Sequence, residues 1–302
     1  MSAVPESSAS LHCGFAALVG RPNVGKSTLL NALVGQRLSI VTPRPQTTRH
    51  RIIGLAQLPD AQIAFVDTPG LHRNARRALN KAMIRTAAAA LAEADVVVFV
   101  VEALAWTSED ALTLQHIARC GQPALVAVNK VDRVRPRERL LPYLAELGAR
   151  HPFLALVPVS ALKARGIADL LRAIAAHLPL SPPLFPRDQL TDRSLSFRIA
   201  EMIREKLTLE LNQEVPYGVA VEIERLADED GRLAVDAAIW VDRAGQKPIV
   251  IGARGERLKR VGTAARLALN NLLQRRLHLR LWVKVRENWA DNARALRDLG
   301  LE

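Results

Sequence analysis

Residues 20–27 carry glycines, a lysine and a serine at the spacing of a phosphate-binding loop, G-x-x-x-x-G-K-S/T, between an apolar run and a helical pattern. Glycines let consecutive backbone N–H groups turn toward phosphate oxygens, and the following helix adds its positive end. Lys26 would contact the β- and γ-phosphates, and the Ser27 hydroxyl would ligate Mg²⁺. The predicted phosphate contacts are Gly20, Arg21, Pro22, Asn23, Val24, Gly25, Lys26, Ser27 and Thr28.

A second motif, Asp67, Thr68, Pro69 and Gly70, follows the strand-like run 63–66. A carboxylate at this place can hold Mg²⁺, usually through water, and the Gly70 N–H can bond the γ-phosphate. Alone, such a motif is as often an ordinary turn at a strand end. It lies about 40 residues after the phosphate loop, which is the separation that a switch GTPase needs.

The motif at residues 129–132 follows another apolar run and selects the base. A carboxylate at Asp132 can accept hydrogen bonds from guanine N1–H and the 2-amino group, whereas adenine would leave it unpaired. The Ala161 N–H, after a further strand-like run, would bond guanine O6. Together these positions predict a guanine pocket made by Asn129, Lys130, Val131, Asp132, Ser160, Ala161 and Leu162.

These motifs, together with Thr47-Thr48-Arg49, resemble the translation-factor-related branch of P-loop GTPases. Residues 45–51 and 67–72 are similar to the Era family of bacterial GTPases, and the likeness extends over about residues 14 to 300. It implies GTP hydrolysis, binding of the 3′ region of small-subunit ribosomal RNA, and a role in 30S subunit assembly. It also implies that Thr48 senses Mg²⁺ and the γ-phosphate, with Thr47 as the alternative.

The position after Gly70 is Leu71, where many GTPases carry a glutamine that orients the attacking water. A leucine cannot do this, so the resemblance implies that another group or a bound cation completes the site. The residues expected to act in hydrolysis are Lys26, Thr48 and Gly70, with Mg²⁺ held by Ser27, Thr48 and Asp67. Asn23 matches an asparagine that helps to hold K⁺ in such relatives, and it can equally be a residue that shapes the loop.

The pattern of residues 14–180 alternates strand-like and helical stretches, which is typical of a parallel sheet covered on both faces. We therefore expect an α/β P-loop GTPase domain with a doubly wound, mostly parallel sheet. The expected strands are 15–19, 63–66, 96–101, 125–128 and 156–159, and the expected helices are 26–34, 81–92, 110–119 and 167–177.

Four prolines between residues 178 and 186 cannot continue a helix or a central strand and mark a domain boundary. After them we expect a small α+β domain with a helix at 195–211, strands at 218–226 and 232–242, a glycine-bounded loop, a helix at 256–277 and a strand at 278–286. The predicted organisation is a flexible tail 1–13, a GTPase domain 14–180, a linker 181–193 and a KH-type RNA-binding domain 194–302.

Gly252 and Gly255 form a G-x-x-G loop that enters a basic helix. Because neither glycine projects a side chain, a nucleic-acid backbone can approach closely, and an adjacent apolar groove would take about four unpaired bases. The loop resembles that of KH domains of the prokaryotic type, which commonly have lysine where this chain has Arg254; the arginine retains the charge. The predicted RNA contacts are Ile249, Ile251, Gly252, Ala253, Arg254, Gly255, Arg257, Lys259 and Arg260, with Leu258 in the groove; Trp282 and Trp289 either stack bases or belong to the core.

The charge of the chain favours a polyanionic partner: its formal net charge is +12 and its pI about 10.6. Residues 247–286 hold 11 basic residues and one acidic residue, whereas 187–246 hold 8 and 13. Single-stranded RNA is the expected partner and an anionic inner-membrane surface the alternative; a metabolic ATPase or kinase is disfavoured by Asp132. No secretory signal or spanning segment is evident, and Cys13 and Cys120 are expected as free thiols of a cytoplasmic protein, with peripheral membrane association compatible.

Overall fold

The structure, a computed structural model, describes residues 11–42, 50–67, 89–211, 218–229, 231–292 and 296. The chain divides into two compact units. The first comprises Met1–Leu38, Arg51–His72 and Thr86–Asp192, and the second comprises Ser39–His50, Arg73–Arg85 and Arg193–Glu302. The last boundary between them along the chain, after Asp192, lies at the end of the linker predicted from the prolines. Within the described residues, no helix is long and apolar enough to cross a membrane.

The first unit is built on a seven-stranded sheet with the order β2-β3-β1-β4-β5-β6, to which β7 adds beside β1. All neighbouring pairs are parallel except β2 with β3 and β7 with β1. The central strands are almost wholly apolar because helices cover both faces. The strands are β1 (Leu11–Val19), β2 (Ile52–Gln57), β3 (Ala61–Asp67), β4 (Val96–Glu102), β5 (Ala124–Asn129), β6 (Leu156–Pro158) and β7 (Leu180–Ser181).

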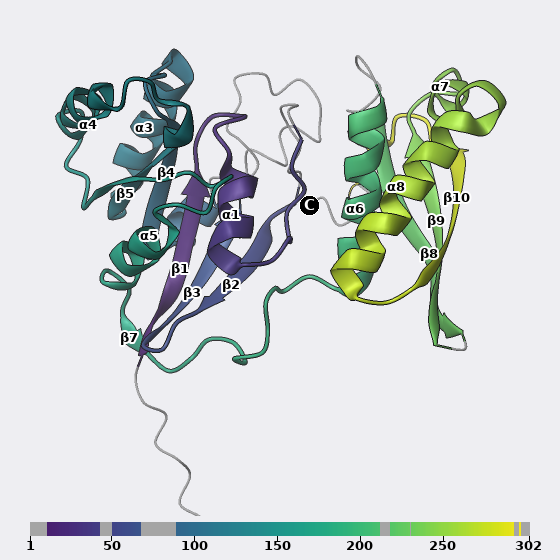
Figure 1. Cartoon of the computed structure of the whole chain (residues 1–302), viewed down its shortest axis with the longest axis horizontal. Coiled ribbons are helices and arrows are strands. Elements are labelled where there is room, and N and C mark those ends of the chain that lie inside the picture. Colours follow the sequence, from purple (N-terminus) through teal and green to yellow (C-terminus); the bar gives the residue numbers. More distant parts are fainter. Residues whose placement is uncertain are drawn as a thin grey trace, which may run out of the picture. The chain divides into compact units, whose positions relative to one another are not determined.

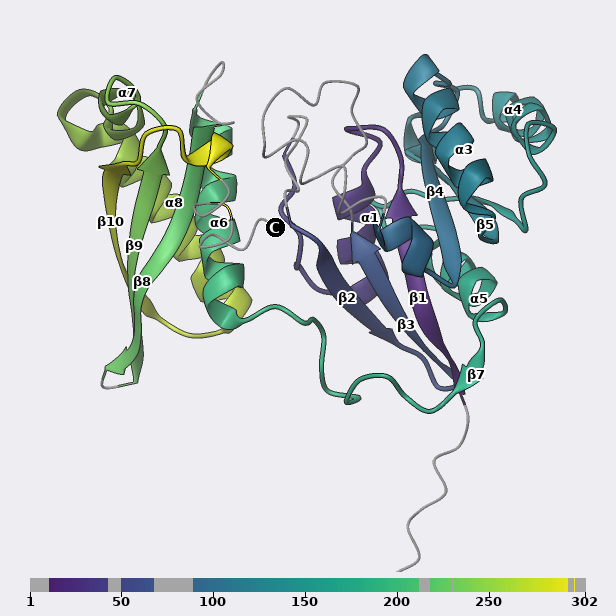
Figure 2. The same ribbon diagram turned by 180° about the vertical axis from the view of Figure 1, so that it is seen from behind.

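Helices α1 (Lys26–Val34) and α5 (Ile167–Ala175) cover one face of this sheet, and α3 (Ser108–Cys120) and α4 (Leu140–Gly148) cover the other (Figures 1 and 2). Connections between parallel strands through helices bring the carboxyl ends of the strands to one edge. The loops after β1, β3, β5 and β6 therefore emerge together, and these are the loops that carry the predicted nucleotide motifs.

The proline-rich segment is fixed to the first unit by Gln62, a buried side chain on β3. Its Oε1 accepts hydrogen bonds from the N–H groups of Leu184 and Phe185 at 2.7 and 2.9 Å, and its Nε2 donates to the Phe185 carbonyl at 2.8 Å. Further along, Thr191 bridges to Gly54 on the β2 edge. The segment is thus ordered and lies along the sheet, and contacts with the first unit fix it as far as Thr191.

Substitution Gln62→Ala is expected to lower the free energy of unfolding of the first unit by about 2 kcal/mol, because it removes three hydrogen bonds to the proline-rich segment and one to Gln57, and leaves partly buried N–H groups unpaired. Urea unfolding followed by circular dichroism measures this loss. Gln122→Ala is the matched control, since that amide makes one 3.5 Å bond at the surface. Equal stabilities of the two variants would contradict a fixing role for Gln62.

The second unit has a three-stranded sheet, order β10-β9-β8, with helices on one face (Figure 1). The β8–β9 pair is antiparallel and β9–β10 is parallel. Apolar side chains of α6, α8 and the inner face of the strands form one core. The elements are α6 (Leu195–Glu210), β8 (Val219–Glu229), β9 (Arg232–Val241), α7 (Gln246–Ile251), α8 (Glu256–Leu273) and β10 (Leu277–Val285).

Several sequence-based expectations need correction. The predicted tail 1–13 is too long, because β1 already begins at Leu11. The sequence reading missed β2, the short β7, α4 and α7, and it extended α8 four residues beyond its end at Leu273. Both cysteines are free thiols, as expected; Cys13 is buried and Cys120 is exposed.

The two candidate stacking tryptophans have different environments. Trp289 is wholly buried and donates from Nε1 to the Gly218 carbonyl at 3.2 Å, so it belongs to the core and cannot stack a base. Trp282 is half-buried on the strand face turned away from the helices, with the Lys284 ammonium 5.9 Å from its ring centroid. Of the predicted helix 81–92, only the last residues fall in the described part, where 89–93 are helical.

Candidate functional site

The phosphate loop connects β1 to α1 with backbone that only glycine adopts easily. Gly20 has φ 154° and Gly25 has φ 100°, and a Cβ on Gly20 would lie 2.3 Å from the Val100 carbonyl oxygen. Lys26 is buried and its Nζ donates to the carbonyls of Gly20 and Arg21 at 2.7 and 3.0 Å. Burial lowers the pKa of Lys26 to about 8, which makes its charge sensitive to whether an anion is beside it.

Ser27 and Asp67 meet at the carboxyl end of β3. The Ser27 hydroxyl donates to Oδ2 of Asp67 at 3.1 Å, and the carboxylate is wholly buried. Two oxygen donors side by side, next to the first turn of α1, match the ligand preference of Mg²⁺, which takes a few protein oxygens and keeps several waters. The sequence prediction that Ser27 and Asp67 lie together is confirmed by this contact.

Asn129 joins three loops of the site through one buried amide. Its Nδ2 donates to the Val24 carbonyl at 2.8 Å, and its Oδ1 accepts from the N–H groups of Lys130 and Ala161 at 2.8 and 3.0 Å. A Cβ at Gly25 would lie 2.4 Å from the same Nδ2, so this position has to be glycine. The residue thus ties the phosphate loop to both base-binding loops, whereas the sequence reading gave it only a place in the base pocket.

A cavity of about 160 Å³ lies among these loops and is lined by residues of all three motifs. Asp132 borders it and accepts at Oδ1 from the Ser160 hydroxyl at 2.6 Å. This hydrogen bond lowers the pKa of Asp132, so the carboxylate is ionised at neutral pH and able to accept from guanine. The lining residues are Gly25, Thr28, Asn129, Lys130, Asp132, Arg133, Ala161 and Leu162.

The predicted donor to guanine O6, the Ala161 N–H, already donates to Asn129 in this structure. A guanine carbonyl would therefore share this donor.

Lys130 has left-handed backbone, with φ 65°. Its Nζ pairs with Glu102 at 2.8 Å.

Two acidic residues that the sequence reading passed over brace Arg21 of the phosphate loop. Its guanidinium lies 3.0 Å from Asp110 on α3 and 3.3 Å from Glu102 at the end of β4. Asp110 also accepts from the N–H and hydroxyl of Thr107, which caps α3. Burial opposes ionisation of Glu102, but hydrogen bonds and charge from Lys130 and Arg21 outweigh it and lower its pKa. Sequence separations of 81 and 89 residues leave no local signal for these pairs.

Not all predicted residues can be placed. Thr47, Thr48, Thr68, Pro69, Gly70 and Leu71 lie outside the described residues. Asn23 is exposed and has left-handed backbone, with φ 62°, a conformation that asparagine tolerates better than most residues. Its part in a K⁺ site stays a prediction, which the ratio of hydrolysis rates in K⁺ and Na⁺ buffers would test.

The G-x-x-G loop lies between α7 and α8 and is shaped by left-handed backbone at three positions. Gly252, Arg254 and Gly255 have φ values of 76°, 50° and 78°. A Cβ on Gly252 would lie 2.7 Å from the Cβ of Arg257, whereas one on Gly255 would meet only open space. Arg254 is exposed at the tip of the loop and free to meet a phosphate.

Of the other predicted RNA contacts, Ile249 is 43% exposed, and Ile251 and Leu258 are half-buried against the core. Ala253 is exposed in the loop. Arg257 donates to the Ile249 carbonyl and so fixes the end of α7 to the start of α8. The apolar residues and the loop are therefore brought together, as the sequence predicts.

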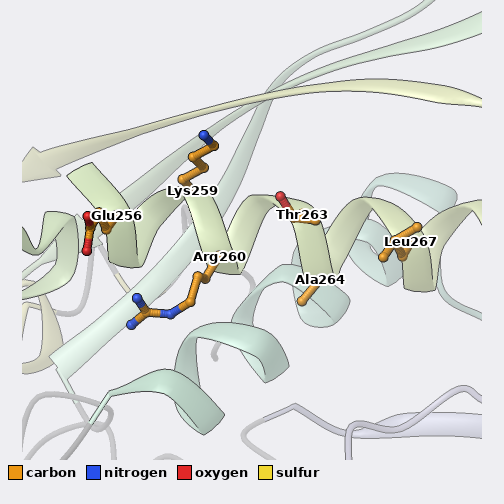
Figure 3. A pocket seen from close by; sticks show the side chains of 6 residues that line it. All are labelled: Glu256, Lys259, Arg260, Thr263, Ala264 and Leu267. Carbon is orange, nitrogen blue, oxygen red and sulfur yellow. The ribbon is translucent and has the colours of Figure 1, made fainter. Parts of the chain in front are cut away.

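Lys259 and Arg260 leave α8 on opposite sides (Figure 3). Arg260 points toward α6 and pairs with Glu210 at 3.2 Å, while Lys259 is exposed without an ion pair among the described residues. The surface of α8 between these two side chains has a hollow of about 480 Å³ with a mainly apolar floor. Its lining residues are Glu256, Lys259, Arg260, Thr263, Ala264 and Leu267.

The fold and these two sites define a P-loop GTPase joined to a KH domain. Residues 15–130 match the family described as 50S ribosome-binding GTPase, and residues 214–290 match the KH domain. GTPase Era of Marinobacter nauticus is 50% identical over 289 residues, which cover 96% of this chain and 95% of that relative. GTPase Era of Azotobacter vinelandii is 48% identical over 96% of this chain and 97% of its own. The chain therefore belongs to the Era family and is a GTPase.

Two solved structures match over nearly the whole chain. A variant of Aquifex aeolicus Era bound to GDP·AlF₄⁻ has a TM-score of 0.92 and 39% identity, covering 96% of this chain and 99% of that one. Era in complex with MgGDPNP and nucleotides 1506–1542 of 16S ribosomal RNA matches with the same values. Both the doubly wound GTPase fold and the following KH domain predicted from the sequence are thereby confirmed.

Proposed function

We propose that this chain binds GTP with Mg²⁺, hydrolyses it, and binds single-stranded RNA from the 3′ end of small-subunit ribosomal RNA during assembly of the 30S subunit. The observation that carries the RNA assignment is the exposed Arg254 between two glycines with left-handed backbone, on a domain that matches KH domains. The relative solved with 16S ribosomal RNA nucleotides 1506–1542 supports the choice of RNA.

The nucleotide chemistry follows from the positions of the polar groups. Asp132 selects guanine, and the N-terminal turn of α1 with its buried Lys26 provides positive charge for the phosphates. Ser27 and Asp67 would hold Mg²⁺, which neutralises charge on the β- and γ-phosphate oxygens when it is bound. The side chain of Leu71 has no polar group that can orient the attacking water. We therefore expect slow GTP hydrolysis in the absence of RNA or another activator.

The G-x-x-G loop would bind RNA by letting its sugar-phosphate backbone approach closely. Without a Cβ at Gly255, a sugar-phosphate chain can come against the loop, and Arg254 can bond its phosphate oxygens. The exposed Ile249 and the half-buried Ile251 provide an apolar surface for unpaired bases.

Substitution Arg254→Glu is expected to weaken binding of a short unpaired RNA from the 3′ end by about tenfold to a hundredfold, the value of a lost charge-assisted hydrogen bond with added repulsion. Fluorescence anisotropy measures the affinity, and GTP hydrolysis without RNA is expected to stay unchanged. Arg266→Glu makes the same change at an exposed position further along α8 and is the control. Equal RNA affinities of the two variants would remove the loop from the RNA site.

A further inference from the structure

A second cavity, of about 420 Å³, borders the guanine motif of the GTPase unit at Asp132. One wall comes from the loop after β5 and the other from the loop after β6, and these two strands are parallel neighbours. The loop after β6 is closed by two hydrogen bonds between the backbones of Ser160 and Arg165, at 3.0 and 3.1 Å. The cavity is therefore formed by anchored chain and has the size of ordinary ligand pockets, about 300–1,000 Å³.

Four cations surround this cavity over an apolar floor of Val134 and Leu140. They are Arg135, Arg137, Lys163 and Arg165, and we call this cavity with its four cations the basic pocket. All four side chains are exposed, and within the described part of the chain none of them pairs with a carboxylate. The one acid in the lining, Asp132, already accepts from Ser160.

What distinguishes these cations from the other exposed and unpaired arginines of the described chain, such as Arg119, is that four of them line one cavity. Some exposed arginines of this chain are neutralised by a neighbouring acid, as Arg172 is by Asp169. Unpaired cations that converge on a concave apolar floor produce a positive potential that an anion relieves. The fitting ligand has a phosphate for the guanidinium groups and a flat apolar part for the floor.

We propose that the basic pocket is an RNA site of the GTPase unit, which takes a phosphodiester and one unpaired nucleotide in addition to those held by the KH domain. The inference rests on the proposed function, because it needs RNA as the partner. A KH loop holds only about four nucleotides, whereas a relative was solved with nucleotides 1506–1542. An RNA of that length has many more phosphates than the G-x-x-G loop can contact.

An anionic lipid surface is the competing occupant, since Leu141 beside the pocket is 76% exposed. Lipid surfaces are bound by apolar side chains that protrude from a basic face. Here the apolar floor is recessed between the cations, Val134 being only 4% exposed. The concave shape favours an inserted nucleotide over a planar membrane.

The test uses the double variant Arg137→Gln/Arg165→Gln in the full chain, with two RNAs. One spans the 3′ region of small-subunit ribosomal RNA, and the other is a hexanucleotide that fills the KH loop alone. For the long RNA, the slope of log affinity against log salt concentration should become shallower by about 0.7 per lost phosphate contact, about 1.4 in total. Affinity for the hexanucleotide and GTP hydrolysis without RNA should not change.

The matched control is Arg119→Gln/Arg187→Gln, which removes two exposed charges that make no ion pair among the described residues, one on α3 and one in the proline-rich segment. Loss in the pocket variant alone supports the site. An unchanged slope, or an equal change in the control, overturns it. Binding to vesicles of phosphatidylglycerol and phosphatidylethanolamine is measured as well, and a pocket variant that loses affinity for these vesicles but not for RNA also overturns the proposal. If the unaltered chain binds neither RNA, the proposed function fails as well; if it binds both and the pocket variant is unchanged, only this inference fails.

Discussion

Replacement of Asp132 by asparagine is expected to weaken GDP binding about a thousandfold, because two charge-assisted hydrogen bonds to guanine, each worth about 2 kcal/mol, are lost. The amide presents an NH₂ group where the carboxylate accepts from the base. Xanthine has a carbonyl at the 2-position, so it can accept from this NH₂, and XDP should bind the variant more tightly than GDP. Displacement of a fluorescent nucleotide by GDP, XDP and ADP measures the order of affinities.

A neighbouring acid provides the control for this experiment. Glu138 is exposed, and Glu138→Gln removes one negative charge without touching the base pocket. It should bind GDP as the unaltered chain does. The Asp132 variant keeps a partner for the Ser160 hydroxyl through its amide oxygen, so its melting temperature should stay close to that of the control. An Asp132→Asn chain that still prefers GDP to XDP would show that the base is selected elsewhere.

The nucleotide motifs could be predicted from the sequence because each is contiguous and sits at a strand end. A parallel sheet brings such ends to one edge regardless of the distances along the chain. Contacts between Ser27 and Asp67, and between Asn129 and Ala161, follow from that rule. The rule specifies which loops meet, and the residue types then specify what they bind.

Side-chain partners that depend on packing could not be predicted in this way. Glu102 and Asp110 are ordinary acids in the sequence, one ending a strand and one in the first turn of a helix. They brace Arg21 only because β4 pairs with β1 and α3 packs against β4. Gln62 is a similar case, a polar residue in an apolar strand whose partners in the proline-rich segment are more than a hundred residues away.

The missed elements have local reasons. Strand β2 contains Gly54, which weakens a strand signal, yet a Cβ there would lie 2.8 Å from Val34, so α1 packs closely against it. Helix α7 has six residues and contains Pro248, so its pattern is too short to be told from the loop before Gly252. The basic pocket was missed because its cations come from two loops, and a charge count along the chain does not show which of them converge.

Lys26 gives the second large effect, a pH dependence of nucleotide binding. Burial lowers the pKa of Lys26 to about 8, while bound phosphates would raise this pKa by stabilising the charged amine. Binding therefore takes up a proton once the pH exceeds about 8. Affinity for GDP should be constant below that pH and fall above it by up to about tenfold per pH unit, until the pKa of the complex is reached.

Guanine N1–H also loses its proton at high pH, which would weaken nucleotide binding as well. Two variants of Lys26 distinguish this effect from the titration of the lysine. Lys26→Met has no charge to titrate, so any decline it keeps belongs to the base, and its hydrolysis rate should fall about a hundredfold or more. Lys26→Arg stays charged over the whole range and should bind with the shallow pH profile of the methionine variant but more tightly. If the decline above pH 8 persists unchanged in Lys26→Met, the buried amine is not the titrating group. If the decline disappears in Lys26→Met and the hydrolysis rate of this variant falls, the buried ammonium is what holds the phosphates. The reason is that Lys26→Met removes the charge and leaves the guanine pocket intact.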